Sequence, residues 1–313
     1  MTLKVGYLLP TREQVMRGRP EAAPLLRLAE KAEDLGFDSV WVGDSVLARP
    51  RHEPLTLLAC VAGRTRRVAL GTAVLLPALR NPVLLGHQVA TVDQVSQGRL
   101  ILGVGIATDV PNIRAEFRAA GVPFEGRVGR MNEGLRLCRA LWRGEPVDWD
   151  GRWQLQGAVL GPTPHRPGGP PIWLGGSVEA VRQRAGRLYD GWFPNGVDPA
   201  AWRAQWAEVK DAAKAAGRDA AALTGAFYLT VSLDDDKATA ETRLDGFLEA
   251  YYGQRRPDVM RKGQVCYAGP AEGAAQCLRE YAEAGVEHIV LRVAGEHERH
   301  LESLAKVRAD LDT

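Results

Sequence analysis

Short apolar runs alternate with amphipathic stretches along the whole chain of 313 residues. Runs of a few β-branched, aromatic or aliphatic residues predict buried strands, and apolar residues three and four positions apart predict helices. The expected strands cover residues 3–9, 39–42, 67–75, 98–105, 172–176, 191–196, 225–233 and 288–293. The expected helices cover residues 21–36, 53–65, 81–96, 130–144, a stretch ending at 188, 199–217, helical material up to about 256, 270–285 and 296–311.

A long connection follows each expected strand, and parallel pairing requires crossovers of that length. Eight strand–helix units within 313 residues match the size of a (β/α)8 TIM barrel with one insertion. The insertion after strand 4 would be residues 106–171, with no periodicity over 106–127 and a hairpin over 146–157. An open, doubly wound sheet is the competing arrangement. Residues 1–313 are expected to form a single domain.

Charge and composition exclude several classes of function. The net charge of +2 gives no reason to expect a nucleic-acid or membrane partner, and the longest uncharged apolar run, residues 68–79, is too short to span a bilayer. The four cysteines form no C-x-x-C pair, and the histidines are scattered, so no metal site is expected. Reduced thiols and the lack of a visible secretory signal favour a cytoplasmic protein.

In a TIM barrel the active site lies at the C-terminal ends of the strands. Asp44 follows the apolar run SVWVG and is either a cap for the next turn or a site residue. Gly175, Gly176 and Ser177 follow another expected strand and precede a helix, with Ser177 as a candidate N-cap. Free backbone N–H groups there would favour a phosphate, although a plain strand–turn–helix connection has the same pattern. LGVGIATD (102–109) lacks the third glycine of a dinucleotide fingerprint and indicates only close backbone approach to a ligand.

Several long stretches together resemble the luciferase-like flavin-dependent oxidoreductases. They include LAEKAEDLGFDSVWVGDS (28–45), the segment 70–105, EFRAAGVPFEGR (116–127), PTPHRPGGPPIWLGGS (162–177), AGRLYDGW (185–192) and the segment 267–292. They cover most of the chain in the family's order. The resemblance implies a TIM barrel that binds FMN or the deazaflavin coenzyme F420.

The resemblance also assigns roles to particular residues. The cofactor ring would lie over a bulge at Ala73–Val74, with a non-proline cis peptide, and Asp44 would lie beside it. Gly175, Gly176 and Ser177 would hold the phosphate. The remaining residues assigned to the ring's other edge, to the substrate or to orientation are Thr72, Gly105, Asp109 and Asn112. Asp44 and Asp109 are the candidate acid/base groups.

One position departs from the family's F420-dependent sugar-phosphate and alcohol dehydrogenases, which commonly have Asp-His where this chain has Asp44-Ser45. A serine is no general base near neutral pH without an activating neighbour. The sequence therefore favours a two-component monooxygenase that uses reduced FMN, supplied by a separate flavin reductase, and O2. The alternative is an F420-dependent dehydrogenase or reductase that transfers hydride, and a third hypothesis is a flavin-binding protein without turnover.

The substrate is expected to be a small organic molecule, and the protein a homodimer, as relatives often are. Loop residues that could line the substrate pocket are Arg12, Arg49, Trp149, Trp153, Asn195, Tyr251 and Tyr252.

Overall fold

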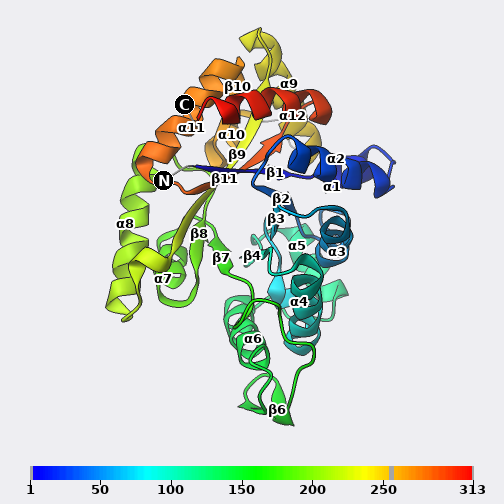
Figure 1. Ribbon diagram of the computed structural model, residues 1–313, viewed down its shortest axis with the longest axis vertical. Helices are drawn as coiled ribbons and strands as arrows, with labels where there is room; N and C mark the ends of the chain where they lie inside the picture. The colour runs from blue at the N-terminus through cyan, green and yellow to red at the C-terminus, as the bar shows by residue number, and fades with distance from the viewer. Residues whose placement is uncertain (1–2, 254–256, 312–313) are drawn as a thin grey trace.

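The computed structural model describes residues 3–253 and 257–311. Its centre is a closed barrel of parallel strands surrounded by helices (Figure 1). The barrel strands, in order around the sheet, are β1 (Lys4–Leu8), β2 (Ser39–Val42), β3 (Ala69–Thr72), β4 (Leu100–Val104), β7 (Ile172–Gly175), β8 (Gly191–Phe193), β9 (Thr224–Leu233) and β11 (His288–Val293). The barrel closes because β11 pairs with both β9 and β1, and β8 pairs with β9. The predicted (β/α)8 fold is confirmed, and the open sheet is wrong.

Helices follow the strands, as the sequence pattern predicts for all but two short ones. They are α1 (Thr11–Met16), α2 (Ala23–Asp34), α3 (Pro54–Arg64), α4 (Pro82–Ser96), α7 (Glu179–Leu188), α8 (Pro199–Ala215), α9 (Lys237–Tyr252), α10 (Pro257–Gly263), α11 (Ala271–Ala284) and α12 (His297–Ala309), with short 3-10 turns η1 (Pro77–Leu79) and η2 (Ala220–Ala222). The short α1 and α10 were not expected. Local chemistry sets the starts of the longer ones: the Asn81 side chain accepts hydrogen bonds from the first backbone N–H groups of α4, and Asp198 does the same for α8. The part of the expected helix beyond residue 253 lies outside the described residues.

The insertion after β4 contains α5 (Pro111–Ala119), α6 (Arg127–Leu141) and the antiparallel pair β5 (Val147–Asp150) and β6 (Gln154–Ala158). Figure 1 shows α6 and the hairpin extending away from the barrel at the lower end of the molecule. The hairpin was expected, but α5 was not. A further short strand, β10 (Cys266–Gly269), pairs with the C-terminal half of β9 and was also not expected.

The barrel interior is filled by apolar side chains, several of them large, that come from most of the barrel strands. Trp41 from SVWV is fully buried, and its ring lies 5.4 Å from that of Trp173 and 5.3 Å from that of Phe193. The barrel is therefore a packed core, and it leaves room for a ligand only at its ends. None of the helices in the described ranges is long and apolar enough to cross a membrane.

Candidate active site

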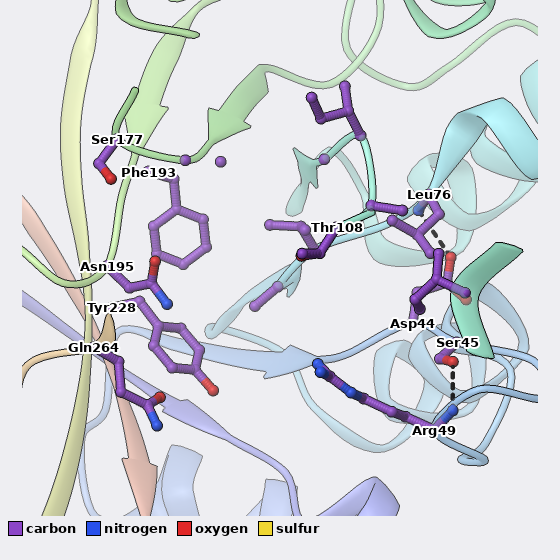
Figure 2. A pocket seen from close by; sticks show the side chains of 18 of the residues that line it. Asp44, Ser45, Arg49, Leu76, Thr108, Ser177, Phe193, Asn195, Tyr228 and Gln264 are labelled. Carbon is purple, nitrogen blue, oxygen red and sulfur yellow. Dashed lines mark hydrogen bonds between the residues drawn. The ribbon is translucent and has the colours of Figure 1, made fainter. Parts of the chain in front are cut away.

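A cavity of about 540 Å³ opens at the C-terminal ends of the barrel strands. Every barrel strand, or the loop that follows it, contributes to the wall: Leu8, Asp44, Ala73, Gly105, Gly175, Phe193, Tyr228 and Arg292. Figure 2 shows Phe193, Asn195 and Tyr228 on one side and Asp44 and Leu76 on the other. This volume lies within the usual range for small-molecule sites.

The floor of the cavity is a bulge at the end of β3. The Ala73–Val74 peptide is cis, as the resemblance implied, and both residues line the cavity. The Val74 side chain lies between β4 and β7. A Cβ atom on Gly105 would approach Val74 Cγ2 to 2.6 Å, and one on Gly175 would approach Val74 Cγ1 to 3.1 Å. The two glycines therefore make room for Val74 beneath the cavity.

The turn after β7 lines the same cavity with Gly175, Gly176 and Ser177. Gly176 has a φ of +116°, a backbone conformation that residues other than glycine rarely adopt. Helix α7 begins at Glu179 with Val178 as its N-cap and without a side-chain cap, so Ser177 does not cap it as predicted. In this first turn the Val181 N–H donates to the Val178 carbonyl at 2.9 Å, but the N–H groups before it have no partner within the helix, so the turn still offers donors to an anion.

Asp44 lines the cavity, but both of its oxygen atoms are engaged. Oδ2 accepts a hydrogen bond from the Leu76 backbone N–H at 2.9 Å, and the two oxygens form a bidentate ion pair with Arg80 at 2.6 and 3.1 Å. The side chain is 2% exposed. Asp44 thus fixes the segment that follows the bulge. Its role as acid or base stays a prediction, and the observed geometry favours a positioning role.

The other predicted acid, Asp109, lies at the rim. Its side chain is 54% exposed and pairs with Arg114 Nε at 2.6 Å, and this hydrogen bond lowers the pKa of Asp109. A carboxylate with a lowered pKa holds no proton to donate near neutral pH. Its catalytic role also stays a prediction, with no geometric support.

Thr72 and Asn112 do not belong to the cavity wall. Thr72 is buried and donates its hydroxyl proton to the Gly103 carbonyl at 2.8 Å. Asn112 is exposed and donates from Nδ2 to the Ala48 carbonyl. As cofactor contacts, both remain predictions.

Ser45 is part of a clamp between the β2 loop and α5. Its hydroxyl donates to Glu116 Oε1 at 2.9 Å and accepts from the Arg49 backbone N–H at 2.9 Å. The same Glu116 oxygen accepts the backbone N–H groups of Val46 and Leu47. Ser45 therefore orders the loop that carries Arg49, and Figure 2 shows the Arg49 side chain extending from this loop into the cavity.

Arg292 is a cavity residue that the sequence did not reveal. It is only 2% exposed although it carries a charge, and the other residues of its strand are mostly apolar. Its guanidinium donates to Thr230 Oγ1, to the Tyr252 hydroxyl at 3.0 Å and to Gln264 Oε1 at 2.7 Å. The lone arginine in HIVLRV is the signal that could have found it, since a charge inside a buried strand needs a special environment.

Some of the residues that were expected to line the substrate pocket do line the cavity. Arg49, Asn195, Tyr251 and Tyr252 line the cavity, together with the unexpected Arg51, Tyr228 and Gln264. Arg12 was expected there but does not line it. Trp149 and Trp153 do not line it; they pack with the hydrophobic core around the insertion. The aromatic residues of the hairpin therefore stabilise the insertion.

The fold and the site together define a parallel-barrel protein with a ligand cavity of cofactor size at the C-terminal end. A sequence model of the family described as luciferase-like monooxygenase matches residues 3–311. The F420-dependent glucose-6-phosphate dehydrogenase of Mycolicibacterium smegmatis is 30% identical over 97% of this chain and 96% of its own. The enzyme of the same name from Amycolatopsis mediterranei is 30% identical over 98% and 99%. This chain belongs to the luciferase-like family and is an oxidoreductase.

Solved structures show the same fold. The monooxygenase RslO1 from Streptomyces bottropensis superimposes with a TM-score of 0.83 at 24% identity over 99% of this chain and 100% of its own. An F420-dependent secondary alcohol dehydrogenase, solved with an F420–acetone adduct, gives 0.83 at 21% identity over 98% of both chains.

The expectation of a two-component monooxygenase with reduced FMN is wrong. The curated relatives that match nearly the whole chain are F420-dependent dehydrogenases, which favours the alternative hypothesis. Ser45 in place of histidine does not exclude a dehydrogenase, because the hydrogen bonds of Ser45 to its neighbours give it a structural role. The homodimer stays a prediction.

Proposed function

We propose that the protein is an F420-dependent oxidoreductase that transfers hydride between the deazaflavin and a small organic substrate. The curated relatives support the identity of the cofactor. One structural observation supports its place: Val74 is seated between Gly105 and Gly175 directly beneath a cavity of about 540 Å³. The two glycines add no side chains next to Val74, which leaves space for a planar ring above it.

The residues present fit this cofactor. Ala73, Val74 and Gly105 would support the ring, and Gly175, Gly176 and Ser177 would hold the phosphate through backbone N–H groups. When bound, the deazaflavin supplies the ring carbon that donates or accepts hydride. The protein has to position the substrate, exclude water and handle the proton that accompanies the hydride.

Tyr252 is the candidate for that proton. Its hydroxyl accepts a hydrogen bond from Arg292 Nη1 at 3.0 Å and lies in the cavity wall. Burial by itself would raise the pKa of Tyr252, but the charges of Arg292 and Arg49 outweigh it and hold the pKa below 10. Burial raises the pKa of the neighbouring Tyr228 and makes that hydroxyl a poorer acid. Tyr252 therefore takes the role that the family's histidine has in other members.

Turnover with F420 tests the proposal. The protein is mixed anaerobically with reduced F420 and a panel of carbonyl compounds, and with oxidised F420 and the matching alcohols, while the absorbance of the deazaflavin is followed. We expect protein-dependent oxidation or reduction of F420 at a rate that O2 does not change. O2 consumption driven by reduced FMN and coupled to product formation would contradict it, as would bound F420 that reacts no faster than in solution.

A further inference from the structure

Two arginine side chains, Arg49 and Arg51, line one side of the cavity, and a third, Arg12, lies next to them outside the wall. Arg12 lies in α1 after β1, and Arg49 and Arg51 lie in the loop between β2 and α3. The Arg12 guanidinium stacks over the Tyr251 ring at 4.4 Å, and that of Arg49 lies 5.1 Å from the centre of the Tyr252 ring. Arg51 Nη2 donates to the Tyr251 hydroxyl at 3.3 Å. The two tyrosines thus hold the three cations close together.

These cations have no carboxylate partner. Within residues 3–253 and 257–311, no ion pair joins Arg12, Arg49 or Arg51 to an acidic side chain. Arg12 Nε and Nη1 are buried without any hydrogen-bond acceptor. Within the same ranges the other two arginines of the cavity wall also have no carboxylate partner, but the protein engages them: Arg127 donates to the Ile106 carbonyl, and Arg292 donates to Thr230, Tyr252 and Gln264. Buried donors without acceptors are costly, and a ligand that supplies acceptors would remove this cost.

One acidic group among the described residues, Glu13, interacts electrostatically with Arg12 and Arg51 without forming an ion pair with them. Burial raises the pKa of Glu13 and so disfavours its charged form. Burial, together with the charges of Arg51 and Arg49, lowers the pKa of Arg12. A cluster of like charges in a partly buried wall is unfavourable unless an anion lies among them.

We propose that Arg49 and Arg51 in the cavity wall, with Arg12 next to them, form a subsite for an anionic group of the substrate, a carboxylate or a phosphate. The substrate of the proposed hydride transfer is then an organic acid or a phosphate ester, and the inference rests on that proposed function. Guanidinium groups suit both oxyanions because their N–H groups form two parallel hydrogen bonds. The subsite lies against Tyr251 and Tyr252, so the bound anion anchors the substrate beside the Tyr252 hydroxyl.

The clamp around Glu116 gives this subsite its rigidity. Ser45 Oγ accepts the Arg49 backbone N–H, and Glu116 from the insertion holds Ser45 and the two residues after it. The residue that replaces the family's histidine thus helps to place one of the three cations.

Calorimetric titration of the F420-loaded protein tests the subsite, because the cofactor fills the phosphate-binding turn beforehand. The probes are succinate, glycerol 3-phosphate and, as the neutral control, glycerol. We expect one or both anions to bind, with an affinity that falls as salt is added, and glycerol not to bind. Arg51→Met, which keeps the apolar stem, should weaken anion binding at least tenfold and leave F420 binding intact. Arg203→Met, on the exposed face of α8, should change neither.

Anion affinity that stays within twofold of the wild type in Arg51→Met and in Arg49→Met would overturn the subsite, as would a wild-type protein that binds F420 but neither anion. Failure to bind F420 would instead contradict the proposed function. The same titration of the cofactor-free protein then decides about the arginines, since only the subsite predicts a difference between Arg51→Met and Arg203→Met. Thermal unfolding of each variant verifies that it is folded.

Discussion

The two ends of the barrel carry cavities of similar size but of different chemistry. The cavity at the C-terminal end measures about 540 Å³ and the one at the N-terminal end about 500 Å³, and both have several cationic side chains in their walls. At the N-terminal end, Arg99 donates hydrogen bonds to Thr65 Oγ1 at 3.0 Å and to four backbone carbonyls, those of Ala62, Thr65, Val68 and Ser96. At the C-terminal end, Arg12, next to the cavity wall, has two buried nitrogen atoms without a partner.

The difference separates a structural end from a functional one. A guanidinium whose N–H groups are all engaged by the protein holds loops together and has nothing left for a ligand. One whose donors are unused is stable only with water or a ligand near it. The two cavities do not differ clearly in volume or in charge. They differ in whether the protein itself engages the N–H groups of the arginine compared at each end.

The largest effect should come from replacing one arginine at each end of the barrel by methionine. Arg99→Met should lower the free energy of unfolding by about 3 kcal/mol, because several buried acceptors lose a charged donor, and should leave F420 and anion binding unchanged. Arg49→Met should lower the free energy of unfolding by less than about 1 kcal/mol and weaken anion binding at least tenfold. Urea unfolding and calorimetry measure the two quantities. The comparison fails if Arg99→Met loses ligand binding while remaining folded.

Tyr252→Phe should reduce the rate of hydride transfer about a hundredfold, the lower range for loss of a general acid, with little change in F420 affinity. In the direction that consumes a proton, the wild-type rate should fall as the pH rises through the pKa of Tyr252, which lies below 10. The variant should lack this decline. Tyr189→Phe is the control, since Tyr189 lies outside the cavity and donates to Asn132. A Tyr252→Phe pH profile identical to that of the wild type would remove Tyr252 from the reaction.

Acid should lower the free energy of unfolding through His288, which lies at the N-terminal end of the barrel. Burial lowers the pKa of His288 to about 3, whereas in the unfolded chain it is about 6.5. Because the unfolded state takes up the proton first, this stability is fully present above pH ~6.5 and is lost as the pH falls toward 3. At pH 5 the loss is roughly 2 kcal/mol, from about 1.5 pH units at 1.36 kcal/mol each. The free energy of unfolding of His288→Gln should decline less between pH 7 and 5; an equal decline would show that His288 does not contribute.

The smallest predicted effect concerns the seat of the cofactor. Gly105→Ala should weaken F420 binding about tenfold, because the new Cβ would meet Val74 Cγ2 at 2.6 Å and displace it. Gly63→Ala, in α3 with no atom within 4 Å of the new Cβ, is the matched control and should bind F420 normally. Equal affinity of the two variants for F420 in a fluorescence titration would mean that Val74 does not support the ring.

Most of the fold follows from the hydrophobic pattern, and the exceptions have physical causes. Helix α5 escaped detection because Glu116, one of its buried positions, is polar and faces the Ser45 loop instead of apolar neighbours. Strand β10 has only four residues, three of them half-buried, so it shows no clear apolar run. β3 ends at Thr72, earlier than its apolar run, because the bulge follows at once.

The site was only partly predictable. The bulge and the glycine turn are local segments, and the resemblance located them. The cationic side depends on contacts between distant parts of the chain, such as Arg292 with Tyr252 and Arg51 with Tyr251. A sequence pattern shows the types of these residues but not that their side chains meet. Asp44 illustrates the reverse case, because its position was foreseen and its partner Arg80 was not.

The most direct test of the account is a parallel titration of the cofactor-free protein with F420 and with FMN, followed by quenching of tryptophan fluorescence. Trp41 and Trp173 fill the barrel interior beneath the cavity and serve as reporters. The account predicts saturable quenching by F420 and an affinity for FMN at least tenfold lower. FMN binding as tight as F420 binding, or no quenching by either, would contradict it.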